Sequence, residues 1–136
     1  LIHGAARRDA AAREALGRAL VEDAAFAPAH ALLGRLAPPA DRAAALHELE
    51  LATELAREDP LYHRWHADAL AAARRPAEAI AALRQVSALA PRWAEPHHRL
   101  AVLLTAAGDT AEARVEHAAF LALAPRKDPL RAGGGR

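Results

Sequence analysis

The sequence overlays on itself when it is displaced by 34 residues. Residues 60–92 and 94–126 carry identical histidine, alanine, leucine and glutamate residues in phase, and both end in Ala-Leu-Ala-Pro-Arg. A fixed period of this length is typical of stacked supersecondary units, none of which buries its own apolar face alone. The repeat therefore predicts an array of similar units.

The composition favours helices throughout. Alanine, leucine, arginine and glutamate have high helix propensity, whereas aromatic residues make up only 4% of the chain. The net charge of +1 has interspersed signs, which argues against nucleic-acid or membrane partners. The absence of cysteine excludes disulfides and thiolate metal sites. No apolar run approaches the ~20 residues that span a bilayer. Arginine far outnumbers lysine, which indicates a G+C-rich bacterial genome, and the compartment is either the cytoplasm or the periplasm.

Prolines, Gly108 and potential capping aspartates divide the chain into a lone helix and three helical pairs. Asp9 and Asp41 are expected to cap helices. The tail at 126–136 lacks apolar periodicity and is expected to be flexible. The expected helices are residues 10–22, 28–37, 42–58, 60–73, 77–90, 94–107 and 110–123.

With this arrangement the sequence resembles the tetratricopeptide-repeat (TPR) superfamily, whose 34-residue unit is a pair of helices. The family places small residues where the two helices approach most closely. The corresponding residues here are Gly34, Ala67 and Ala101 in the first helices, and Ala45, Ala79 and Ala113 in the second. The resemblance implies an all-α, right-handed superhelical solenoid over residues 1–125. Its units are a half-repeat at about 9–26 and repeats at 27–59, 60–93 and 94–125, the first one residue shorter at Pro38-Pro39.

In the family, the first helices of successive units line a concave groove that binds peptides. The groove residues that the resemblance implies are Arg35, Leu61, Arg64, Asp68, Glu95, His98, Val102 and Thr105. The known clamp of Lys, Arg and Asn for a peptide carboxylate has no counterpart, since the chain has no asparagine and only Lys127. We expect a non-catalytic scaffold for a protein or peptide segment, with a mild preference for acidic ligands through Arg35, Arg64 and His98.

The histidines are the only candidates for metal binding or catalysis. His30, His63 and His97 occupy one repeat position, which favours packing of a half-polar ring. The alternative is a metal site that includes His63 and His66, three residues apart on one helix face. No nucleophile motif surrounds Ser87, so neither an active site nor a cofactor is predicted.

Two further expectations concern aromatic residues and the ends of the array. Trp93 is expected to staple consecutive hairpins, with an exposed binding aromatic as the alternative, whereas Trp65 fits neither the packing nor the groove positions. Stacked repeats need polar outer faces at their ends, but the last helix presents Val115 and Leu123. The alternative functions are therefore self-association through uncapped ends, or an accessory or oligomerisation domain of a larger bacterial enzyme or assembly, of which the chain would be a piece.

Overall fold

The computed structural model describes residues 2–133, with side chains for residues 4–131. The described residues form eight α-helices and one 3-10 helix, and no strand, which confirms the predicted all-α class. The elements are α1 (Ile2–Glu22), α2 (Ala27–Leu36), η1 (Pro39–Asp41), α3 (Arg42–Leu55), α4 (Pro60–Ala72), α5 (Pro76–Leu89), α6 (Ala94–Ala106), α7 (Thr110–Leu123) and α8 (Pro129–Gly133).

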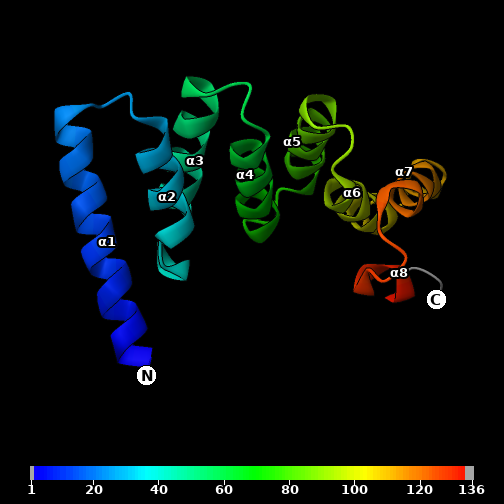
Figure 1. Cartoon of the computed structure of the whole chain (residues 1–136), viewed down its shortest axis with the longest axis horizontal. Coiled ribbons are helices and arrows are strands. Elements are labelled where there is room, and N and C mark those ends of the chain that lie inside the picture. Colours follow the sequence, from blue (N-terminus) through cyan, green and yellow to red (C-terminus); the bar gives the residue numbers. More distant parts are fainter. Residues whose placement is uncertain (1, 134–136) are drawn as a thin grey trace.

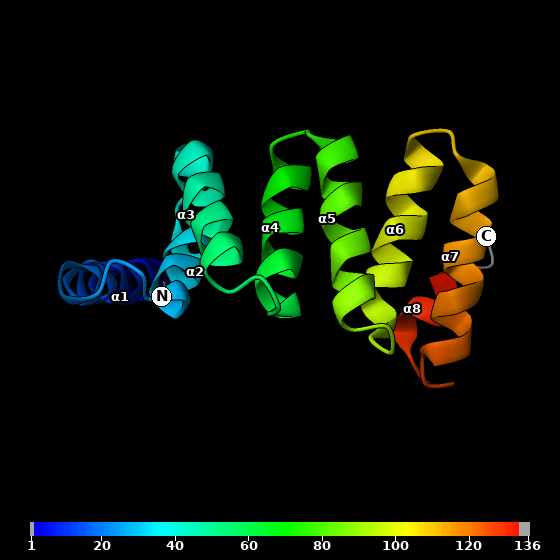
Figure 2. The same cartoon turned by 90° about the horizontal axis from the view of Figure 1, so that it is seen from above.

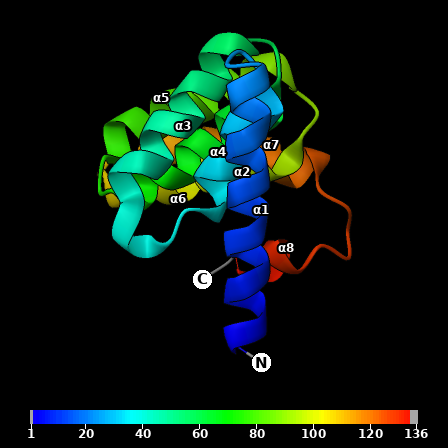
Figure 3. The same ribbon diagram turned by 90° about the vertical axis from the view of Figure 1, so that its left-hand side faces the viewer.

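Three helical hairpins, α2–α3, α4–α5 and α6–α7, stand side by side in chain order (Figure 2). Figure 1 shows an arch with α2, α4 and α6 along its inner side and α3, α5 and α7 along its outer side. Helix α1 packs chiefly on α2, and its N-terminal end extends beyond the hairpins (Figure 3). This translational order is that of the predicted helical-repeat solenoid.

The close approach of paired helices depends on small side chains, as the repeat pattern predicts. A Cβ atom added at Gly34 would lie 2.5 Å from Leu49 Cγ and 3.0 Å from the carbonyl oxygen of Ala45. Ala67, Ala79 and Ala113 are buried at the corresponding positions of the later units. A bulkier residue at these positions would force the helices apart.

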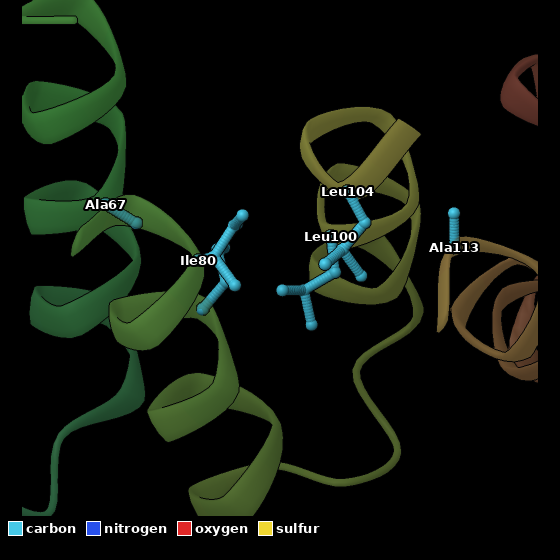
Figure 4. Packing of buried hydrophobic residues seen from close by; sticks show 6 residues of the cluster. Ala67, Ile80, Leu100, Leu104 and Ala113 are labelled. Carbon is cyan, nitrogen blue, oxygen red and sulfur yellow. The ribbon is translucent and has the colours of Figure 1, made fainter. Parts of the chain in front are cut away.

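One apolar cluster joins the second hairpin to the third. In Figure 4, Ile80 of α5 points toward Leu100 and Leu104 of α6. Ala67 of α4 and Ala113 of α7 lie at the two outer sides of this cluster. Each hairpin exposes an apolar face that only its neighbour covers, so burial of this face holds the array together.

The turns follow local chemistry. The side chains of Asp59 and Asp109 accept hydrogen bonds from the backbone N–H of Leu61 and Glu112, at 3.0 and 3.2 Å. Gly108 adopts a φ of +87° in the turn between α6 and α7. Arg74, 34 residues earlier, occupies the equivalent turn with a φ of +59°, a left-handed conformation that favours glycine.

Several helix boundaries differ from those expected. Helix α1 begins at Ile2, so Asp9 lies inside it and caps nothing, because the preceding alanines and arginines are good helix formers. Asp41 ends η1 without a side-chain capping bond, and α3 stops at Leu55. The segment after Pro125 contains α8, although it lacks apolar periodicity.

A charged side chain holds α8 against the preceding helix. Arg131 Nη1 donates to the carbonyl oxygens of Leu121 and Ala124, at 2.7 and 2.8 Å. These carbonyls lie at the C-terminal end of α7, where unpaired acceptors favour a cation. Residues 134–136 of the expected tail lie outside the described part. None of the described helices is long and apolar enough to cross a membrane.

Candidate functional site

An ion network occupies the inner face of the arch, with Arg64 of α4 at its centre. Arg64 is only 7% exposed. Its Nε donates to Glu95 Oε2 at 2.6 Å and its Nη1 to Asp68 Oδ1 at 2.5 Å, while Nη2 bonds the other oxygen of Glu95. Burial acts to lower the pKa of Arg64, but the bonds to the two carboxylates outweigh it and raise the pKa. Arg64 is therefore a buried cation that is paired with two carboxylates.

Two further arginines complete this inner ion network. Arg99 of α6 bonds Glu95 through Nε at 3.1 Å, and its Nη2 lies 3.4 Å from Asp68. Arg35 of α2 approaches Asp68 at 3.9 Å. The side chains of Arg35 and Arg99 are 49% and 47% exposed, so both remain open to an anionic ligand.

The network carries one more positive than negative charge. Arg35, Arg64 and Arg99 face the two carboxylates of Asp68 and Glu95. Burial acts to raise the pKa of Glu95, but the bonds from Arg64 and Arg99 lower it below its ordinary value, so this carboxylate stays ionised at neutral pH. The surplus charge therefore resides on the two half-exposed arginines.

Trp65 contacts Arg35 in this site, although its position in the repeat did not predict a groove or a packing role. The guanidinium carbon of Arg35 lies 4.9 Å from the centre of the Trp65 ring, a cation–π geometry, and Tyr62 packs against the indole at 5.9 Å. Trp65 and Arg35 form a ridge on the inner face.

Two hollows of about 290 Å³ flank this ridge. Both include Arg35, Trp65 and Asp68 in their walls. The first, here called the central hollow, is completed by Leu61, Arg64, Trp93 and Glu95. The second, here called the proline hollow, is completed by Gly34, Ala37, Pro38, Pro39, Arg42, Ala45, Leu49, Ala69 and Ala72.

The structure thus brings five of the predicted groove residues around the central hollow: Arg35, Leu61, Arg64, Asp68 and Glu95. Val102 is 52% exposed and lines a smaller neighbouring hollow together with Arg64, Asp68 and Arg99. The other two predicted residues have local partners. The ring of His98 packs 5.2 Å from that of Phe120, and Thr105 donates to the carbonyl of Ala101 in its own helix.

The groove positions that the resemblance implies do not include Arg99, Trp65 or Trp93. Arg99 and Trp65 share one repeat position, which is outside the positions that the resemblance assigns to the groove. Both are long enough to reach the inner face from the side of the helix. Trp93, expected to staple consecutive hairpins with an exposed binding aromatic as the alternative, is the residue before α6 and lines the central hollow.

The repeated histidines bond to protein groups. Nδ1 of His30 bonds Glu48 at 2.5 Å and Nε2 bonds the Ala24 carbonyl at 2.8 Å, while Nδ1 of His97 bonds Glu116 at 2.6 Å. Nε2 of His63 bonds the Arg57 carbonyl at 2.8 Å.

His66, the other residue named for a metal site, is half-buried, and burial lowers its pKa. Within the described part of the chain, no group of three or more histidines and carboxylates is placed to hold a metal ion. The bonds of His30 to Glu48 and of His97 to Glu116 join the two helices of the first and third hairpins.

The paired helices, the small residues between them and the groove along the inner helices define a TPR-type helical-repeat solenoid. No protein-family model matches the sequence, and no curated protein is significantly similar to it. Several solved structures share the fold.

One such structure is titled "MamA 41-end from Desulfovibrio magneticus RS-1". It has a TM-score of 0.78 at 18% identity, over 92% of this chain and 70% of that one. Another, titled "Crystal structure of MamA", gives 0.77 at 18% identity over 83% of this chain and 67% of that one. This similarity shows that the chain has the TPR fold.

Proposed function

We propose that the chain is a non-catalytic interaction scaffold that binds a segment of another protein along its inner face. The observation that carries the proposal is the ridge of Arg35 and Trp65 between two hollows, with Arg99 half-exposed nearby. Aromatic and arginine side chains are the residue types that contribute most to protein interfaces. Their presence together on one concave face supports a binding site here.

The charge of this face favours an acidic ligand. Arg64 is occupied by Asp68 and Glu95, so it positions these carboxylates and does not meet the ligand. Arg35 and Arg99 retain exposed guanidinium groups. Because Arg35 and Arg99 are half-exposed, each contact with a ligand carboxylate contributes up to about 1 kcal/mol, and two such contacts together favour an acidic segment over a neutral one by roughly tenfold.

The test uses a fluorescein-labelled probe peptide, Glu-Asp-Glu-Leu-Asp-Glu-Asp, and a version in which lysine replaces every acidic residue. The acidic peptide is expected to bind, and the lysine version is not. Replacing Arg35 and Arg99 by glutamine should weaken binding at least about tenfold, and added salt should weaken it further. The matched control replaces Arg57 and Arg114, two arginines exposed elsewhere.

The control variant should bind like the wild type, because it removes the same total charge away from the groove. Equal loss in both double variants would show nonspecific attraction and contradict the proposed site. Equal binding of the acidic and lysine peptides would contradict the preference for acidic ligands.

A second candidate function is self-association, either of the chain alone or as an oligomerisation or accessory part of a larger assembly. Val21 on α1 is 87% exposed and Val115 on α7 is 66% exposed, at opposite ends of the array. Contact between these ends in two copies would bury apolar side chains that single arrays leave in water. Since this contact joins two different ends it can repeat, and sedimentation velocity should then show concentration-dependent dimers and longer oligomers that Val21→Asp weakens. A monomer at every concentration would exclude this function.

A further inference from the structure

The first repeat lacks the last turn of its inner helix. Helix α2 has 10 residues, whereas α4 and α6 have 13 each. Where the later repeats place Leu70 and Leu104, each 3% exposed, the first repeat has Ala37. Ala37 is also outside the helix, with φ −60° and ψ 133°. The volume that a buried leucine fills in the other repeats is therefore left open here.

The prolines make this opening a fixed feature of the chain. Pro38 disfavours a helical conformation of Ala37, so α2 ends before it. The chain then runs extended through Pro38 into the short helix η1, whose first residue is Pro39. Two pyrrolidine rings with restricted φ form one wall, which gives the proline hollow a stiff border.

The lining of the proline hollow is mostly apolar, and its few charged residues give it a net positive charge. Alanine, proline, leucine and tryptophan side chains form most of the lining. The charged lining residues are Arg35, Arg42 and Asp68, two cations against one anion. Arg42 spans from α3 to α4, because its Nη1 donates to the carbonyl oxygen of Ala72 at 2.9 Å. The surplus charge makes the hollow complementary to an acidic ligand with an apolar group.

The size of the hollow selects the kind of group. Its volume of about 290 Å³ lies at the lower limit of the roughly 300–1,000 Å³ typical of small-molecule sites. A single leucine or phenylalanine side chain fits this space. The shared wall of Arg35, Trp65 and Asp68 connects it to the central hollow. A peptide on the inner face would therefore reach both hollows by crossing the ridge.

We propose that the proline hollow is a specificity pocket for one leucine- or phenylalanine-sized side chain of an acidic peptide segment. The carboxylates next to that side chain would face Arg35 and Arg42. This inference rests on the proposed peptide-binding function and adds the residue type that the groove selects.

The test compares three peptides by fluorescence anisotropy. They are the probe Glu-Asp-Glu-Leu-Asp-Glu-Asp, the same peptide with serine in place of leucine, and one with glutamine in place of every acidic residue. Burial of a leucine side chain in the hollow should make the probe bind about tenfold or more tightly than the serine peptide. The glutamine peptide should also bind more weakly, because it lacks the charges that face the arginines.

Two protein variants identify the hollow as the source of this preference. Ala69→Leu fills the hollow from α4 and should reduce the difference between the leucine and serine peptides to less than twofold. It should leave the preference for acidic over glutamine peptides intact. Ala81→Leu, on an exposed position of α5 outside both hollows, should keep the full leucine preference. Ala72→Leu, an exposed position on the same wall, is the second filling variant if Ala69→Leu does not fold.

The outcomes separate the two proposals. Acid-dependent binding with equal affinity for the leucine and serine peptides would overturn the specificity pocket and leave the groove function standing. A leucine preference that survives in whichever filling variant folds would also overturn the pocket. Failure of all three peptides to bind would overturn the groove function itself.

Discussion

The first and third repeats are both helical hairpins, but their inner helices end differently. In the third, Leu104 is buried in a full final turn of α6, and Gly108 reverses the chain directly into α7. In the first, Ala37 and two prolines replace that turn, and the proline hollow remains. The repeat pattern therefore fixes where helices pair, whereas a few residues at the turn decide whether the groove is closed or open.

The same two repeats share a side-chain bond that the second repeat lacks. His30 bonds Glu48, and His97 bonds Glu116. In the second repeat the position of these glutamates holds Ala82, and His63 bonds only backbone among the contacts described. All three hairpins form nevertheless. The histidine–glutamate bond is thus an addition to the hairpin and not a requirement for it.

The largest expected effect is a loss of stability when a buried side chain is removed from the third repeat, in contrast to a side chain added to the first repeat. Phe120 in α7 is fully buried, so Phe120→Ala should lower the free energy of unfolding by about 3–5 kcal/mol. Ala37→Leu places a larger side chain in the first repeat and should change the free energy of unfolding by less than about 1 kcal/mol, because the proline hollow has room for it. Urea denaturation followed by circular dichroism measures both. A cost above 2 kcal/mol for Ala37→Leu would show that the hollow is not available.

The second prediction concerns pH and the first repeat. Both ring nitrogens of His30 face acceptors, Glu48 and the Ala24 carbonyl, which requires a protonated ring. Burial acts to lower the pKa of His30, but these bonds raise it above its ordinary value of 6.5. The stabilisation is therefore complete below pH 6.5 and is lost as the pH rises through the raised pKa. Glu48→Gln should cost about 1.5–3 kcal/mol at pH 6 and less at pH 9.

The pH experiment on Glu48→Gln needs a charge-matched control variant, and it must also account for the titration of His66. Glu54→Gln, on the exposed side of α3, removes the same charge and should leave stability nearly unchanged at both pH values. His66 acts in the opposite direction, because burial lowers its pKa and favours the folded state at higher pH. Comparing each variant with the wild type at the same pH cancels this contribution. A loss from Glu48→Gln that is equal at pH 6 and pH 9 would contradict a protonated His30.

The third prediction tests the closest helix approach. Gly34→Ala places a Cβ atom 2.5 Å from Leu49 Cγ, so the Leu49 side chain or the spacing of α2 and α3 must change. The gain in helix propensity, up to about 1 kcal/mol, offsets part of the cost, and we expect a net loss of about 1 kcal/mol. Ala67 and Ala101 already occupy this position in the later repeats. Thermal unfolding measures the change, and a more stable variant would mean that the first hairpin is packed no more closely than the others.

The smallest effect is expected in the turns. Arg74 has a left-handed conformation at the position of Gly108, so Arg74→Gly relieves strain but adds freedom to the unfolded chain. A net stabilisation of less than about 1 kcal/mol is expected. Gly108→Arg is the reciprocal change and should destabilise by about 1 kcal/mol. Denaturant unfolding of both variants checks the pair, and a loss of stability in Arg74→Gly would contradict strain at this turn.

Local signals account for most of what the sequence predicts correctly. Prolines and capping residues start the helices, as at Asp59 and Asp109, and the period places the small residues between them. The errors fall where local signals are absent. Only Gly4 interrupts the good helix formers between Ile2 and Asp9, and α1 continues through it, so no proline or capping residue marks the first residue of the helix as the structure has it. Arg131, which holds α8, bonds carbonyls 7 and 10 residues earlier.

The candidate site was predictable only in part. The resemblance to TPR proteins placed Arg35, Leu61, Asp68 and Glu95 on the inner face, and they line one hollow. It did not reveal that Arg64 is buried and paired, because its partner Glu95 is 31 residues away. It also gave no place to Trp65, whose contact with Arg35 joins two repeats.

The sequence by itself determined the class of this protein: helical propensity, chain breakers and a 34-residue period require stacked hairpins with small residues between them. Only the tertiary structure decided which arginines remain open and where the groove is hollow. The physical reason is that helix formation depends on neighbours a few residues apart, whereas the pairing and burial of a charged side chain depend on how whole repeats are stacked.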